Sequence, residues 1–183
     1  MIRNAIGMVE LNSIARGFEV CDAMMKVAAV DLIESFSICP GKYIVLVMGD
    51  VASVQSSVGK GKEVGKETVM DSFVIPNVHS DVFPAIMGTT IIKELKAIGV
   101  IETFSVSAVI LAADAAVKAA KIELIEIRLA KGLAGKGFVT LTGEVDAVKA
   151  AIDAGCREIE KEGLLVNRTV IPKPHEALRK ALL

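Results

Sequence analysis

The chain has 183 residues, 52% of them hydrophobic, and its formal net charge is −1. This near-neutral charge, together with an aromatic content of only 4%, disfavours nucleic-acid binding, which needs basic surface and usually stacking aromatics. The longest apolar runs, such as YIVLVM and AVILAA, are far shorter than the roughly 18 residues of a membrane-spanning helix, and no secretory signal pattern is visible. We therefore expect a soluble, cytoplasmic, oligomer-prone protein with no nucleic-acid or membrane partner.

The first half of the chain predicts a strand, a helix, two strands, a second helix and a closing strand. Ser13 and Asp50 open the two helical segments and are typical N-cap residues. A short helix is expected after Pro76, which follows the closing strand. The expected ranges are, in order, 4–11, 13–29, 30–38, 42–49, 50–66 and 68–75.

The first predicted helix carries an apolar stripe. Its members recur at steps of three and four residues, which is the period of one helix face. We expect this face to pack into the core. The stripe comprises Ile14, Phe18, Cys21, Met25 and Ala28.

The second half predicts the same elements in the same order. A β-α-β-β-α-β unit followed by a short helix, present twice, predicts an α+β fold. Each copy is expected to be a small, mainly antiparallel sheet with helices on one face, in ferredoxin-like layering. The expected ranges are 97–104, 107–120, 122–130, 138–143, 144–163 and 164–171, with a loop over 131–137 and a C-terminal helix.

The two halves are also similar in sequence. AIGMVE returns as AIGVIE 92 positions later, and DAMMKVAAVDLIE, which begins at Asp22, returns at the same offset as DAAVKAAKIELIE. MGDVASV and VIPNVH are followed, in the same order, by TGEVDAV and VIPKPH. Matches that keep their order indicate a tandem duplication. We place the two domains at residues 1–92 and 93–183.

These repeated motifs resemble the bacterial microcompartment (BMC) shell domain, in tandem form. The chain looks most similar to the tandem-domain trimeric shell proteins of propanediol-utilising compartments. The resemblance implies a structural protein rather than an enzyme, located in the shell of a microcompartment in the bacterial cytoplasm. It implies a homotrimer that forms a six-domain plate, a pseudohexamer, and that contacts other shell proteins edge to edge.

The resemblance also implies that the loops between the two middle strands meet at the centre of the plate, around a pore. One loop is SICPGK and the other lies in KGLAGKG. The expected pore-loop residues are Ser37, Ile38, Cys39, Pro40, Gly41 and Lys42 in the first half, and Gly132, Leu133, Ala134, Gly135 and Lys136 in the second.

Cys39 is the candidate metal ligand. An iron–sulfur cluster needs several thiolates at one point, and a closed threefold ring brings three copies of one loop around one axis. Three Cys39 thiolates, one from each subunit, are expected to hold one 4Fe–4S cluster per trimer. Tandem-domain members of this type are known for such a cluster, carried by the cysteine of the CPG loop. Electron transfer or cluster delivery would then involve a redox partner enzyme or flavoprotein.

The other two cysteines have an ordinary structural interpretation. Cys21 belongs to the stripe of the first helix, and Cys156 follows Val148 and Ile152 at four-residue steps. Both are expected to be small buried apolar residues. For Cys39 itself, a partly buried loop residue without a metal is the alternative.

Lysines and histidines also recur at equivalent positions. Lys26 and Lys118 occupy the position that the family uses for contacts between plate edges, and simple solvation is the alternative. His79 and His175 each follow VIP-x-x. We expect both histidines to have a structural role where a strand leads into a helix.

Two alternative functions remain from the sequence. One is a shell protein with an open pore for small metabolites and no cluster. The other is a trimeric regulator that binds a small ligand on a ferredoxin-like fold. The sequence contains neither a G-x-S-x-G nucleophile motif nor a histidine–glutamate motif of metalloproteases, so no catalytic residue is expected.

Overall fold

The computed structural model describes residues 4–182. It divides into two compact units between Val78 and His79. This division precedes the end of the first predicted domain at residue 92, because helix α3 (Val82–Met87) packs against strand β6 of the second unit. The predicted boundary refers to the duplication of the sequence rather than to packing, and it stays a prediction.

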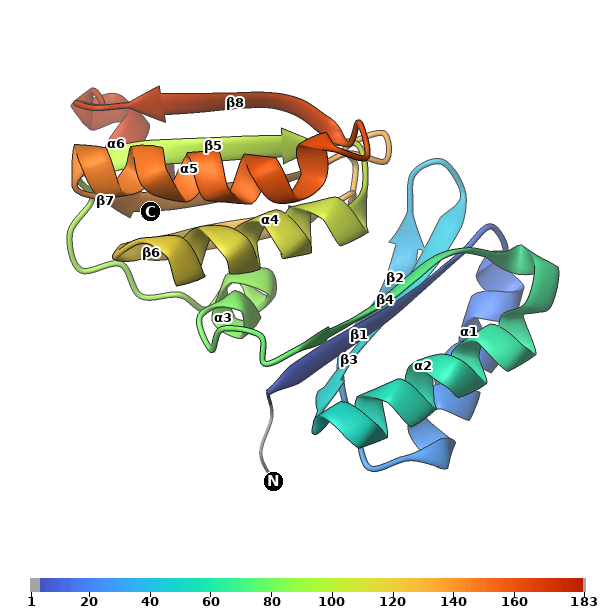
Figure 1. The fold of residues 1–183 in the computed structure, drawn as a ribbon. Coiled ribbons are helices and arrows are strands. Elements are labelled where there is room, and N and C mark those ends of the chain that lie inside the picture. Colours follow the sequence, from blue (N-terminus) through green and yellow to red (C-terminus); the bar gives the residue numbers. More distant parts are fainter. Residues whose placement is uncertain (1–3, 183) are drawn as a thin grey trace. The chain divides into compact units, whose positions relative to one another are not determined.

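The first unit is a four-stranded antiparallel sheet with two helices (Figure 1). The strand order is β2-β3-β1-β4, so the first strand of the chain lies inside the sheet. The elements are β1 (Ala5–Leu11), α1 (Ile14–Val27), β2 (Asp31–Ile38), β3 (Lys42–Gly49), α2 (Val51–Gly65), a 3-10 turn (Lys66–Thr68) and β4 (Val69–Pro76).

The second unit repeats this arrangement with the strand order β6-β7-β5-β8. Each unit therefore has the predicted β-α-β-β-α-β order, and the α+β fold class is confirmed. Besides α3, the elements are β5 (Ala97–Thr103), α4 (Val106–Ala119), β6 (Ile122–Leu129), β7 (Gly137–Gly143), α5 (Val145–Glu160), β8 (Leu165–Ile171) and α6 (Glu176–Leu182).

Both predicted N-caps are confirmed. The Ser13 hydroxyl accepts a hydrogen bond from the Arg16 backbone N–H, and the Asp50 carboxylate accepts one from Ser53 at 2.9 Å. The hydrogen bonds from Ser53 favour the charged carboxylate, so they lower the pKa of Asp50. These residues satisfy backbone donors that the first helical turn leaves unpaired.

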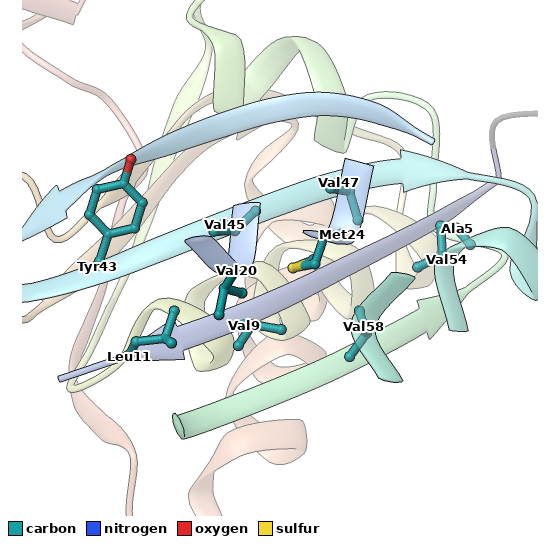
Figure 2. Close-up of a cluster of buried hydrophobic side chains, with 10 residues drawn as sticks. All are labelled: Ala5, Val9, Leu11, Val20, Met24, Tyr43, Val45, Val47, Val54 and Val58. Atoms are coloured by element: carbon teal, nitrogen blue, oxygen red, sulfur yellow. The ribbon is translucent and has the colours of Figure 1, made fainter. Parts of the chain in front are cut away.

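The core of the first unit lies between its sheet and its two helices (Figure 2). Val20 and Met24 of α1, together with Val54 and Val58 of α2, pack against the side chains of β1 and β3. The strands contribute Ala5, Val9, Leu11, Tyr43, Val45 and Val47.

The predicted core stripe of α1 is confirmed only in part, since Cys21 and Met25 pack at the margin of the core but Ile14 and Phe18 are exposed. The buried face of this helix comprises Gly17, Val20 and Met24, whereas Phe18 is 64% exposed and Ile14 is 41% exposed. The helix has two apolar faces, and periodicity does not tell which of them packs against its own sheet. The glycine in the buried face gave the true core stripe a weaker hydrophobic signal.

Candidate functional site

The first pore loop is a tight hairpin. Strands β2 and β3 pair as far as Ile38 and Lys42, which leaves Cys39, Pro40 and Gly41 as the loop. Gly41 has a φ of +71°, a left-handed conformation that glycine adopts without steric cost. Pro40 and Gly41 are exposed and Cys39 is half-buried. The thiol therefore lies at the end of a short hairpin and remains partly accessible.

The second pore loop is longer and contains no thiol. It connects β6 to β7 between the paired residues Leu129 and Gly137. The Lys136 N–H donates to the Leu133 carbonyl at 3.0 Å, which closes a turn. Of the other residues expected in this loop, Gly132 and Ala134 are exposed and Gly135 is half-exposed.

An ion pair supports each loop at its base. Lys42 donates to Glu10 at 2.7 Å, and Lys136 donates to Glu102 at 2.8 Å. Neither glutamate was predicted from the sequence as a partner of these lysines. The sequence does contain a sign of this pairing, because both the lysine and the glutamate recur at corresponding positions of the two repeats.

The two ion pairs differ in burial. The Glu10 side chain is 5% exposed, whereas that of Glu102 is 35% exposed. Removing the partner of a buried charge costs far more than removing the partner of an exposed one.

We expect Lys42→Met to lower the free energy of unfolding by about 2 kcal/mol, because it leaves the Glu10 carboxylate buried without its cation. The matched change Lys136→Met is expected to cost less than about 1 kcal/mol. Urea unfolding of both variants at one protein concentration measures the difference. Equal losses of stability would contradict the importance of the buried pair.

The three cysteines have different environments. Cys156 is fully buried in α5 as predicted, and this burial raises the pKa of its thiol, against the opposing effect of nearby Arg168. Cys21 is half-buried and packs at the margin of the first core. Within residues 4–182, no three histidine, cysteine or carboxylate side chains gather where they could hold a metal ion. A site at Cys39 therefore requires thiols from several chains.

The exposed stripe of α1 has a buried counterpart in the second unit. With the offset of 92, Ile14, Phe18, Cys21 and Met25 correspond to Val106, Ile110, Ala113 and Val117 of α4. All four α4 residues are buried. The two helices thus carry the same apolar pattern, and only α1 leaves it accessible.

The repeated lysines each pair with an aspartate one helical turn earlier. Lys26 donates to Asp22 and Lys118 donates to Asp114, both at 2.6 Å. The Asp22–Lys26 pair is exposed, but the Asp114 side chain is only 9% exposed. Lys118 therefore neutralises a buried carboxylate, a role that was not predicted from the sequence. The edge contact of either lysine stays a prediction.

The two histidines have the same local structure. The His79 ring nitrogen Nδ1 accepts from the Asp81 N–H, and that of His175 accepts from the Ala177 N–H. Each ring thus holds the backbone just before a short helix, which agrees with the expected structural role.

A charged pocket of about 530 Å³ lies in the second unit. Lys96, in its wall, bonds to Glu144 at 2.6 Å and lies 3.4 Å from Glu94. These carboxylates raise the pKa of Lys96, Glu144 most strongly. Lys96 is therefore engaged by two carboxylates of the pocket wall, which Lys93, Lys121 and Glu123 also line.

Within the described residues, no helix combines the length and the hydropathy required to cross a bilayer.

The family model described as BMC domain matches residues 5–78 and 97–174. The chain therefore belongs to the BMC domain family, with one domain in each half, and the resemblance inferred from the repeated motifs is confirmed.

Two similar proteins match this chain over nearly its whole length. The chain is 42% identical over 179 residues to the bacterial microcompartment shell protein PduT of Citrobacter freundii, covering 98% of this chain and 97% of that protein. It is 50% identical to a microcompartment protein of Desulfitobacterium hafniense DCB whose crystal structure has a TM-score of 0.95, covering 98% of this chain and 99% of that one.

A single-domain relative matches about half of the chain. The shell protein EutM of Salmonella typhimurium LT2 is 41% identical over 86 residues, covering 47% of this chain and 88% of its own length. The relatives are named as shell proteins and not as enzymes, which supports the expectation of a structural protein.

Proposed function

We propose that three copies of this chain form a six-domain plate that tiles the shell of a bacterial microcompartment, and that three Cys39 residues bind one iron–sulfur cluster at its centre. The main observation in favour of this assembly is the apolar stripe of α1, in which Ile14 and Phe18 are exposed while the corresponding residues of α4 are buried. Burial of apolar side chains is the main favourable contribution to association. The whole-length similarity to a microcompartment shell protein supports the same assignment.

The Cys39 loop suits a shared metal site. Its thiol is partly accessible on a short hairpin, and a threefold axis would bring three such thiols together. Thiolate is the ligand that iron–sulfur clusters require. A cluster held there would supply one-electron transfer across the shell, between a donor such as a flavoprotein and an enclosed enzyme, or would itself be delivered.

An open metabolite pore is the second candidate. It is favoured by the second loop, where the exposed Gly132 and Ala134 and the half-exposed Gly135 present little side-chain bulk. The iron content of the protein decides between these two functions. A trimeric ligand-binding regulator receives no support, because the relatives are named as shell proteins.

Wild-type protein is expected to have the mass of three chains in native mass spectrometry and to form sheets in electron microscopy. We expect Lys26→Ala to prevent sheets while the trimer persists, because it removes an exposed ammonium group from the proposed plate edge.

Lys60→Ala on α2 is the matched control, since it also breaks an ion pair within a helix. Lys118 is unsuitable for this test because it neutralises the buried Asp114. A monomeric wild type would overturn the plate, and normal sheets from Lys26→Ala would overturn only the edge assignment.

A further inference from the structure

In the second unit, a hydrogen bond joins a backbone N–H to a carboxylate, and both partners belong to motifs that occur twice in the chain. The other copies of these two motifs are not bonded to each other in the described structure. Asp114 on α4 accepts a hydrogen bond from the His79 backbone N–H at 2.8 Å and another from Lys118 at 2.6 Å. His79 ends the first copy of the VIP-x-x-H motif, and Asp114 belongs to the second copy of the D-A-x-x-K motif. The contact therefore joins the end of one repeat to a helix of the next.

The complementary copies of these motifs are Asp22 with Lys26 on α1, and His175 after β8. Asp22 bonds to Lys26, but its side chain is 63% exposed. Within residues 4–182, the His175 backbone N–H has no hydrogen-bond acceptor, although the His175 carbonyl and ring are engaged at the start of α6. One acceptor and one donor of the repeated contact thus remain available.

The surroundings of Asp22 are apolar in the way that a protein interface requires. Ile14, Phe18, Cys21 and Met25 lie at the positions whose counterparts on α4 are buried. These four residues and Asp22 are here called the α1 face. Phe18 also stacks at a tilt on Tyr43, with ring centroids 5.1 Å apart, which limits its motion and makes it a suitable anchor.

We propose that the α1 face binds the segment 171–175 of a second copy of this chain, with Asp22 accepting a hydrogen bond from the partner copy's backbone at His175. This inference rests on the proposed trimer and names the contact that closes it. The same contact is already made inside the chain by Asp114 and His79. Around the proposed trimer, contacts within one chain would therefore alternate with contacts between two chains. A head-to-tail contact of this kind closes into a ring when its rotation fits.

The contact combines two favourable contributions. A hydrogen bond from a backbone N–H to a carboxylate is stronger than one between neutral groups. Burial of Phe18 and Ile14 removes apolar surface from water. Since the donor is the backbone amide, the side chain at residue 175 can be changed without removing the bond.

Cross-linking tests the pairing directly. The full chain carries Cys39→Ala and His175→Cys and keeps its native Cys21, which is adjacent to Asp22 and leaves the carboxylate in place. A short bis-maleimide at low protein concentration should then give covalently linked species of two and three chains. Cys156 is fully buried and does not compete for the reagent.

The matched control carries Cys21→Ala, which copies the alanine at the α4 position, and Glu63→Cys, together with Cys39→Ala and His175→Cys, because Glu63 is an exposed acidic residue that pairs with a lysine on α2. It is expected to give single chains only. If wild-type protein is trimeric but the pair at residues 21 and 175 gives no linked chains, or links only within one chain, the inference is overturned and the proposed trimer stands. A monomeric wild type overturns both.

A second measurement does not depend on cross-linking. Asp22→Ala is expected to raise the concentration at which the trimer dissociates by at least about tenfold, as expected for loss of a charge-assisted hydrogen bond. Asp22→Asn keeps an acceptor and should lie between this variant and the wild type. Glu19→Ala breaks a comparable ion pair on the same helix and should leave dissociation unchanged. Equal effects of Asp22→Ala and Glu19→Ala would overturn the contact.

Discussion

Cys39→Ser is expected to reduce the iron content of anaerobically reconstituted protein from about four atoms per trimer to almost none, because a hydroxyl is a poor ligand for iron–sulfur centres. The visible charge-transfer absorption should disappear with the iron. The fold should persist, since Cys39 is half-buried in a loop and belongs to no described core cluster. Iron analysis and absorption spectra of the purified trimer are the measurements.

The other two cysteines provide the controls. Cys21→Ser and Cys156→Ser should both retain full iron. Cys156→Ser should lower the free energy of unfolding by about 1–3 kcal/mol, since it buries a hydroxyl in an apolar environment. Cys21→Ser should cost less, because that residue is only half-buried. Undiminished iron in Cys39→Ser, or iron-free wild type after reconstitution, would leave the open pore as the better function.

Gly17→Val is expected to destabilise the first unit by about 3 kcal/mol, because the valine side chain would overlap the Tyr43 ring, which is held in place and cannot move aside. A Cβ atom at Gly17 would collide with the Tyr43 ring, and that ring is buried and bonded to Ser35 through its hydroxyl. Thermal or urea unfolding of the trimer, at one protein concentration, measures the loss.

The second unit has the reverse combination at the same two positions. Val109 corresponds to Gly17, and Gly137, which pairs across the sheet with Thr103, corresponds to Tyr43. A Cβ atom at Gly137 would lie 2.8 Å from a Val109 methyl group. Each unit therefore places one large and one small residue where the helix crosses the strand.

This exchange supplies a rescue experiment. The double variant Gly17→Val with Tyr43→Gly copies the pair of the second unit and should recover part of the stability that Gly17→Val loses. The single change Tyr43→Gly should itself be destabilising, because it empties a buried site. If the double variant is no more stable than the sum of the two single losses predicts, the two positions are not complementary.

Much of the fold was predictable because its signals are local. Strand alternation, helix period and the N-cap residues Ser13 and Asp50 depend on near neighbours in the chain. The repeated motifs then identified the duplication and the family, and they correctly placed a loop between β2 and β3 and another between β6 and β7. Cys39 was recognised as unusual for the same local reason, since it lies in a turn and follows no apolar period.

The sequence by itself thus determined the order of the elements, their duplication, their caps and the loop that carries Cys39. Only the tertiary structure decided which face of α1 packs against its own sheet and that the Glu10 and Asp114 carboxylates are buried. It also showed that the small Gly17 and the large Tyr43 are replaced in the second unit by a larger and a smaller residue. The two repeats have nearly the same local pattern, so local signals treat them alike. Burial depends instead on which surfaces meet across the fold, and the equivalent residues Phe18 and Ile110 therefore have the same helical period but opposite exposure.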